Sequence, residues 1–221
     1  MAALIVLMGA DGSGKSTLAR ALCQKLKDRG EKAVVTWATL RPVLLKPFII
    51  AAKFLFVRKH DKFKNYTAHV TAKKAGMRKF AFANGIYLLV LVLDYLPQLL
   101  FKVVLPRLIG RHVICDRYYH DLMLDYAIST GANPERMMQL IRRMDIFLPR
   151  PHLHYYVTVP IETSLARKDD IPSRAYLEER RDYYEHMTRA LDLPVLDGET
   201  PPDQNCTRIL DDMNRTGALP L

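Results

Sequence analysis

A glycine-rich motif near the N-terminus constrains this chain more than any other feature. Residues 9–16 read Gly-Ala-Asp-Gly-Ser-Gly-Lys-Ser and satisfy the pattern G-x-x-x-x-G-K-S/T. The apolar run Leu4–Leu7 before the motif is typical of a buried parallel strand, and helical spacing follows it at Leu18, Leu22 and Leu26. A strand, a glycine loop and a helix in this order predict a phosphate-binding loop, or P-loop, rather than a chance glycine turn.

The residue types of the P-loop have separate uses in holding a nucleoside triphosphate. Glycines let backbone N–H groups turn inward around phosphate oxygens, and the helix N-terminus adds a positive dipole. Lys15 is expected to reach the β- and γ-phosphates, and the Ser16 hydroxyl to meet Mg²⁺. The predicted nucleotide-binding residues are therefore Gly9, Ala10, Asp11, Gly12, Ser13, Gly14, Lys15, Ser16 and Thr17.

A carboxylate and a guanidinium follow a second apolar run. His112–Cys115 is a predicted strand, and Asp116 and Arg117 come directly after it. Ligands of open α/β sheets collect at the carboxyl ends of strands, so we expect both side chains near the P-loop. Asp116 could hold Mg²⁺ or orient the attacking oxygen, and Arg117 could neutralise the transferred phosphoryl group. The structural alternative is a helix cap and a surface charge.

Five short apolar runs alternate with helical patterns, which predicts a parallel sheet. The predicted strands are 4–7, 33–37, 112–115, 155–159 and 195–196, and predicted helices include 16–30, 134–144 and 203–214. With 221 residues, of which 49% are hydrophobic and 25% charged, the chain is expected to form a single domain, residues 1–221. The predicted fold class is α/β, a three-layer P-loop NTPase fold with a central parallel five-stranded sheet and helices on both faces.

The formal net charge of +10 predicts a surface that attracts anions such as nucleotides, nucleic acids or acidic lipid headgroups. Nucleic acid is not an expected partner, because no zinc finger, RNA-binding signature or long basic arm is visible. Cys23, Cys115 and Cys206 are far apart and odd in number, as expected of reduced thiols. We therefore expect a cytoplasmic protein.

Two stretches raise the question of a membrane. Ile86–Ile109 is apolar enough to consider as a span, but Asp94, Pro97, Lys102 and other polar or helix-breaking residues interrupt it, so we expect a buried helix. The apolar and basic stretch Phe48–Lys64 fits either an interfacial helix or a buried helix with a solvated basic face, and the second interpretation is favoured.

From its P-loop through Thr17, its Asp116-Arg117-Tyr118 element and the basic stretch from Arg167, the chain resembles the thymidylate kinase family of nucleoside monophosphate kinases. The resemblance spans nearly the whole length. It implies an ATP-dependent kinase that uses Mg²⁺, held here by Ser16 and Asp116, and phosphorylates a small acceptor such as dTMP. It also raises the expectation of a homodimer.

The resemblance assigns acceptor-side roles to further residues. It places Asp11 opposite the acceptor's sugar and Asp116-Arg117-Tyr118 between donor and acceptor, where Tyr118 either stacks on a base or packs internally. Arg41, followed by Pro42, is similar to the family's arginine loop after the second strand. Asp94 stands where the family has the aspartate of an Asp-Arg pair, in the helix before the Asp-Arg-Tyr strand. The predicted substrate-binding residues are therefore Asp11, Arg41, Asp94 and Tyr118.

A lid is expected at approximately residues 166–176. The run Arg167–Arg174 stands where such kinases carry an arginine-bearing lid, and a basic hinged segment could neutralise phosphates and exclude water. Lys15, Asp116, Arg117, Arg167 and Arg174 are the predicted catalytic residues. The alternative for the basic run is a solvated turn between two helices.

One position departs from the resembled family. In that family, the helix before the Asp-Arg-Tyr strand carries an Asp-Arg pair, and its arginine grips the acceptor's phosphate. Here Asp94 is followed by Tyr95 instead. The departure leaves open a non-nucleotide acceptor, such as a sugar, a sugar phosphate or a lipid-linked molecule. A nucleotide-switched binding module without an acceptor is the alternative from a different class.

Overall fold

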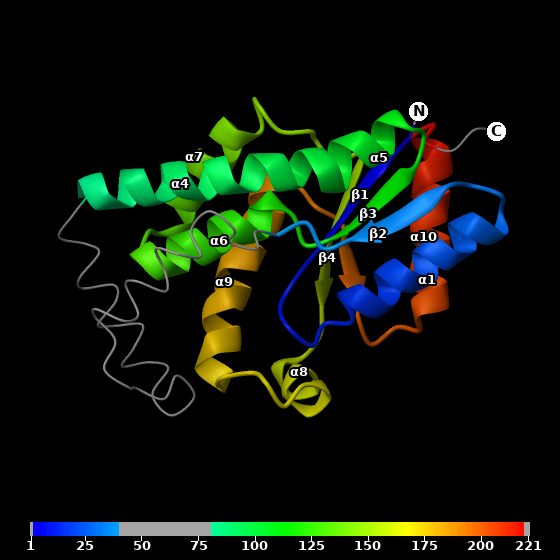
Figure 1. Cartoon of the computed structure of the whole chain (residues 1–221). Helices are drawn as coiled ribbons and strands as arrows, with labels where there is room; N and C mark the ends of the chain where they lie inside the picture. Colours follow the sequence, from blue (N-terminus) through cyan, green and yellow to red (C-terminus); the bar gives the residue numbers. More distant parts are fainter. Residues whose placement is uncertain (1, 40–80, 219–221) are drawn as a thin grey trace.

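The computed structural model describes residues 2–39 and 81–218, without the side chains of 81–84. Arg41 and the stretch 48–64 lie outside the described residues. A single sheet of five parallel strands organises the described residues (Figure 1). The strands are β1 (Leu4–Met8), β2 (Ala33–Thr36), β3 (His112–Asp116), β4 (Leu153–Thr158) and β5 (Val195–Asp197). Their order is β2-β3-β1-β4-β5, so the predicted parallel five-stranded sheet is confirmed.

Alternate residues of β1 enter two separate cores. Ile5 and Leu7 pack with α1 (Lys15–Asp28) and α10 (Pro202–Arg215). Leu4, Val6 and Met8 face the other core. That second core also holds side chains of α4 (Ala81–Leu99), α6 (Tyr119–Thr130), α7 (Pro134–Met144) and α9 (Arg174–Leu191). A strand buried on both faces needs apolar residues throughout, and the result is the predicted three-layer α/β fold.

The predicted helix over Ile86–Ile109 is present, but it is not buried all round. Three segments continue one another: α4, a π-helical segment η1 (Leu100–Val104) and α5 (Leu105–Leu108). One face packs in the core through Leu91, Tyr95, Leu99 and Val103, whereas the other exposes many leucines. The expectation of a buried helix is therefore correct for the inner face of the helix and wrong for its outer face. Both faces are apolar, so the sequence carried no periodicity that could separate them.

The same stretch passes a length and hydropathy test for crossing a bilayer. Residues Gly85–Leu108 have a mean hydropathy of 2.0 in their most apolar window, and 28% of that window is buried. It is the one such helix within the described ranges. Core helices of soluble proteins can satisfy the same criterion, so the test alone does not place the chain in a membrane.

The carboxyl ends of the strands gather the predicted site at one edge of the sheet. The P-loop follows β1, and Asp116 ends β3 in register with Leu7 of β1. β4 leads into α8 (Ile161–Arg167), and β5 ends at Asp197, next to Gly198. Parallel strands direct these four connections to the same edge, which is where ligands of open α/β sheets bind.

Candidate functional site

The P-loop is packed so closely that two of its glycines have no room for a side chain. Gly9 has a φ of 147°, and a Cβ there would collide with the carbonyl oxygen of Val157. Gly12 has a φ of 81°, and a Cβ there would lie 2.8 Å from the carbonyl oxygen of Ser164. Larger residues would distort a loop whose turn lets backbone N–H groups point at phosphate. The loop therefore has the close packing that a phosphate cradle requires.

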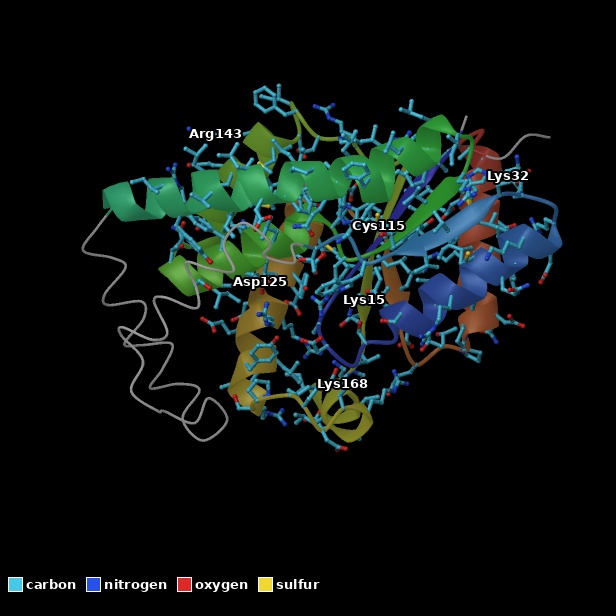
Figure 2. The ribbon with its side chains drawn as sticks, viewed as in Figure 1. Lys15, Lys32, Cys115, Asp125, Arg143 and Lys168 are labelled. Atoms are coloured by element: carbon cyan, nitrogen blue, oxygen red, sulfur yellow. The ribbon has the colours of Figure 1, made fainter. Side chains whose placement is uncertain are left out.

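Lys15 is buried at the start of α1, with a side chain that is directed back over the loop. Its Nζ donates hydrogen bonds to the Ala10 carbonyl oxygen at 2.5 Å and to Ser13 Oγ at 3.0 Å. Burial, and then the charge of Arg117, lowers the pKa of Lys15 to about 7, although Asp116, Asp121 and Asp11 act in the opposite direction. Figure 2 shows Lys15 beside the P-loop at the sheet edge. An anionic phosphate bound there would restore the lysine's charge.

Ser16 and Asp116 meet directly, although 100 positions separate them in sequence. The Ser16 hydroxyl donates a hydrogen bond to Oδ2 of Asp116. A hydroxyl and one carboxylate are the oxygen ligands with which proteins hold Mg²⁺ beside a nucleotide, because the cation keeps waters and takes phosphate oxygens as well. The described residues contain no cluster of three or more metal-ligating side chains. The donor set therefore fits Mg²⁺ that accompanies a nucleotide.

Arg117 occupies a strained backbone position and connects several parts of the site. Its φ of 73° is left-handed, which is unusual for a residue other than glycine. Its Nη2 donates to Oδ1 of Asp11 at 2.8 Å, and its Nη1 donates to Asp121 and to the Tyr184 hydroxyl, both at 3.2 Å. Strain at such a position is characteristic of functional sites held in place by their surroundings.

Two carboxylates take opposite pKa shifts around Arg117. Burial raises the pKa of Asp121, which Arg117 and the hydroxyl of Tyr184 only partly offset. For Asp11 burial acts in the same direction, but Arg117, the Tyr176 hydroxyl and Lys15 outweigh it, so its pKa falls below the ordinary value. Asp11 therefore remains an anion in the P-loop.

Helix α9 supplies residues that the sequence analysis did not predict. The Tyr176 hydroxyl donates to Oδ2 of Asp11 at 2.9 Å, and the Tyr184 hydroxyl donates to Asp121 at 2.6 Å. Between them Arg180 lies over the Tyr176 ring and pairs with Asp125 at 2.7 Å. These three residues recur every four positions on one face of α9, a spacing that was available in the sequence. No motif marked that face as part of a site.

The two predicted lid arginines have different surroundings. Arg167 ends α8, and its Nη1 lies 3.1 Å from the Gly198 carbonyl oxygen and 3.5 Å from that of Gly12. Arg174 begins α9, where it is exposed and pairs with Glu162 and Glu178. Lys168, labelled in Figure 2, lies 3.7 Å from Asp11. The structure thus brings Arg167 and Lys168 to the P-loop, but not Arg174.

Two adjoining clefts open at this edge. The larger, of about 380 Å³, is lined by the P-loop, Asp116, Arg117, Trp37, Arg167 and Lys168. The smaller, of about 220 Å³, lies between Leu18, Val157 and residues 198–202, and it shares Gly14, Thr17 and Arg167 with the first. A charged cleft joined to a smaller, more apolar one matches the phosphates and the base of a nucleotide.

Two further predicted substrate residues, Asp94 and Tyr118, are buried. Asp94 is 2% exposed. Tyr118 is fully buried, and its hydroxyl donates to the Pro149 carbonyl oxygen at 3.0 Å. Of the two uses considered for Tyr118, packing is the one that this structure displays, because a buried ring cannot stack on a bound base. Arg41 lies outside the described residues.

Tyr95 is also buried, at the position where the resembled family has arginine. It is 1% exposed, and its hydroxyl donates to the Ala38 carbonyl oxygen at 2.7 Å. Lys102 of the same helical stretch donates to the Trp37 carbonyl oxygen at 3.2 Å. Tyr95 and Lys102 therefore hold the segment after β2 that places Trp37 in the larger cleft.

Comparisons with known proteins agree with this geometry. No protein-family model matches the chain. The sequence is 28% identical over 206 residues to a thymidylate kinase of Herpetosiphon aurantiacus, which covers 93% of this chain and 73% of that protein. Probable thymidylate kinases of Pyrococcus horikoshii and Pyrococcus abyssi are 27% and 28% identical over 172 residues, 74% of this chain and 68% of each relative. With the parallel sheet and the P-loop, these alignments show that the chain is similar to thymidylate kinases over most of its length.

Proposed function

We propose that this protein is a kinase that transfers the γ-phosphate of ATP to a nucleoside monophosphate such as dTMP. The observation that carries the proposal is the meeting of Lys15, the Ser16–Asp116 pair and Arg117 around one cleft of about 380 Å³. Phosphoryl transfer needs little covalent chemistry from the protein, because catalysis comes mainly from positioning and charge neutralisation. Positioning and charge neutralisation are both supplied here, by the N–H groups of the P-loop, a lysine, a hydroxyl–carboxylate pair and an arginine.

Each residue has a defined contribution in this proposal. The P-loop holds the phosphates of ATP, and Lys15 gains its proton when anionic oxygens replace its bonds to Ala10 and Ser13. Ser16 and Asp116 hold Mg²⁺, which when bound neutralises phosphate charge. Arg117, aligned by Asp11 and Asp121, stabilises the charge that develops on the phosphoryl group.

The segment around residues 166–176 acts as the lid in this proposal. Arg167 and Lys168 already lie beside the P-loop, so a small movement would bring both onto bound phosphates. Arg174 would have to leave Glu162 and Glu178 to take part. The whole chain acts as one kinase domain in the cytoplasm, either as a monomer or as a homodimer.

One observation favours a second candidate acceptor. Tyr95 is committed to the core and to the Ala38 carbonyl oxygen, so this helix presents no arginine at the position that grips an acceptor phosphate in the resembled family. Asp11, expected opposite the acceptor's sugar, is engaged by Arg117 and Tyr176. Both contacts favour an acceptor other than a nucleoside monophosphate, such as a sugar, a sugar phosphate or a lipid-linked molecule.

Release of ADP from Mg-ATP tests the proposal across nucleoside monophosphates, nucleosides, sugars and sugar phosphates. Lys15→Ala serves as the blank, and Gln24→Ala, on the surface of α1, as the matched control. Turnover stimulated by dTMP or another monophosphate, absent in Lys15→Ala and retained in Gln24→Ala, is the expected result. Turnover confined to sugars or nucleosides would favour the second candidate.

A measurement of ATP binding shows whether a lack of turnover arises because no tested acceptor is a substrate or because the protein does not bind ATP. Trp37 is the single tryptophan of the chain and lines the larger cleft, so its fluorescence should change when Mg-ATP binds. A fluorescence change with no acceptor-stimulated release for any compound would favour a nucleotide-switched binding module. No fluorescence change and no turnover would contradict the proposed function.

A further inference from the structure

Exposed apolar side chains are concentrated on one helical stretch. Among the described residues thirteen large hydrophobic side chains are exposed, and nine of them lie between residues 86 and 109. We call these nine the apolar stripe: Ile86, Leu89, Leu93, Leu96, Leu100, Phe101, Leu105, Leu108 and Ile109. Exposed apolar surface this concentrated marks an interaction site.

From Ile86 to Leu105 the stripe is not interrupted by exposed charge. The only charged residues between positions 85 and 106 are Asp94, which is 2% exposed, and the half-buried Lys102, whose Nζ donates to the Trp37 carbonyl oxygen and to Gln98 Oε1. Residues on either side of the stripe, such as Val90, Val92 and Val104, are apolar as well. The outer half of the helix is therefore apolar over more than five turns.

We propose that the apolar stripe docks this protein on the surface of an anionic lipid bilayer, with the helix in the membrane plane. An interfacial helix combines a broad apolar face with a polar opposite side, and here the body of the protein takes the place of that polar side. The chain carries a formal charge of +10, and Arg107 and the exposed Arg111 stand at the end of the stripe. Acidic headgroups complement that charge.

A second apolar and basic spot supports the same occupant. Ile146 and Phe147, in the loop after α7, are 71% and 81% exposed, and Arg142, Arg143 and Arg150 around them are exposed too. Figure 1 shows this loop along the upper edge of the molecule, the edge that α4 and α5 also follow. Apolar side chains beside arginines can enter the acyl region while the guanidinium groups meet phosphate headgroups.

The inner face of the helix favours docking over crossing. Leu91, Tyr95 and Val103 pack in the core, and the Tyr95 hydroxyl holds the Ala38 carbonyl oxygen. A helix that crossed the bilayer would break this packing and carry Asp94 into hydrocarbon. Lying in the interface leaves the fold intact.

Charge also favours lipid over a second copy of the chain. A paired-helix seam is a narrow stripe bordered by charged residues, whereas this face is broad and its flanks are apolar. Two copies that each carry a formal charge of +10 repel each other, whereas anionic headgroups attract that charge.

Docking goes beyond the proposed kinase activity and does not depend on it. Co-sedimentation with vesicles of phosphatidylcholine and phosphatidylglycerol tests it, with vesicles of phosphatidylcholine alone for comparison. Wild type should pellet with the anionic vesicles, and Leu89→Glu/Leu93→Glu should bind at least about tenfold more weakly. Val195→Glu, which alters an exposed side chain at the opposite edge of the sheet, should bind like wild type. Lys15→Ala should also bind like wild type, so a failed kinase assay and failed docking are distinguishable.

Circular dichroism establishes that each variant is folded before its binding is compared. The proposal is overturned if wild type stays in the supernatant at low salt, or if the double variant pellets as well as wild type. Resistance to alkaline carbonate extraction would mean that the helix crosses the bilayer instead. A dimer in sedimentation velocity that the double variant dissociates, with no vesicle binding by wild type, would assign the stripe to a second copy.

Discussion

Arg117 Nη2 lies 2.8 Å from Oδ1 of Asp11 and so joins the end of β3 to the P-loop across 106 positions of sequence. The same guanidinium reaches Asp121, which is 1% exposed. One side chain therefore aligns a loop carboxylate and offsets a buried one. Its left-handed backbone is maintained by these contacts.

Arg117→Ala should destabilise the protein by about 3 kcal/mol or more, because it leaves the Asp121 carboxylate buried without its cationic partner. Urea denaturation measures the change. Arg174→Ala, which removes an exposed arginine with two surface partners, is the control and should leave the denaturation midpoint unchanged. Equal midpoints for wild type and Arg117→Ala would contradict this account of the ion pairs.

Asp116→Asn should abolish the increase in ATP affinity that Mg²⁺ produces, while affinity without Mg²⁺ changes little. The reason is that the Ser16–Asp116 pair supplies the protein's metal ligands. Titration of Trp37 fluorescence with ATP, with and without Mg²⁺, measures both affinities. Asp28→Asn, an equivalent change at the far end of α1, is the control and should retain the increase in ATP affinity with Mg²⁺. If Asp116→Asn also retained this increase, the assignment of Asp116 as a metal ligand would be refuted.

ATP binding at pH 8 should be accompanied by uptake of nearly one proton. Burial lowers the pKa of Lys15 to about 7, so the free protein holds this amine mostly neutral at pH 8, and bound phosphate restores the charge. At pH 6 the amine is already charged and uptake should be small. Calorimetry in buffers of different ionisation enthalpy measures the protons, and Lys15→Met should show no comparable uptake.

The same pKa shift predicts a pH dependence of stability. Unfolded Lys15 keeps its proton up to about its ordinary value of 10.5, whereas the folded form releases it near 7. Because the unfolded state then binds more protons, the free energy of unfolding of wild type relative to Lys15→Met should rise with pH between these values. A difference that stays constant from pH 7 to pH 10 would exclude this linkage.

Gly198→Ala should weaken ATP binding roughly tenfold. A Cβ at Gly198 would collide with the Ser13 carbonyl oxygen and lie 2.8 Å from Val159, so the P-loop would have to shift. Titration of Trp37 fluorescence with Mg-ATP measures the loss. Gly85→Ala is the matched control, because nothing lies near its Cβ, and it should leave ATP affinity unchanged. Wild-type affinity in Gly198→Ala would show that this contact is not needed.

Tyr95→Phe should destabilise the fold by about 1 kcal/mol, since it leaves the buried Ala38 carbonyl oxygen without its donor. ATP affinity should stay close to that of wild type. Tyr95→Arg should be more destabilising, because a guanidinium has to enter a site that is 1% exposed. If Tyr95→Arg instead folds normally and gains turnover with dTMP, the acceptor pocket lies closer to Tyr95 than proposed.

Local sequence patterns predicted much of the fold. Runs of apolar residues such as Leu4–Leu7 and His112–Cys115 mark strands covered on both faces, and all five predicted strands are present within two residues of their observed bounds. The P-loop was predictable because strand, glycines and helix follow one another without a gap. Asp116 and Arg117 could be proposed as site residues because they stand at the carboxyl end of a predicted strand.

Other site residues had no such local signature. Tyr176 and Tyr184 lie on the amphipathic helix α9, and Asp121 lies on α6, which is buried over most of its surface. They join the site only because α6 and α9 pack side by side beside β1 and β3. Gly198 resembled any turn residue until its contact with Ser13 was visible. Arg174 was predicted from its charge and from its place in the expected lid, but it pairs with Glu162 and Glu178.

The sequence by itself determined a P-loop on a parallel sheet, because adjacent residues create that signal and any packing must preserve it. Only the tertiary structure decided which side of the 86–109 helix is covered and that Tyr95 is tied to Ala38. A helix that is apolar all round has no preferred face of its own, so its orientation follows from the surfaces it meets. Here the core took one face of that helix and left the apolar stripe exposed.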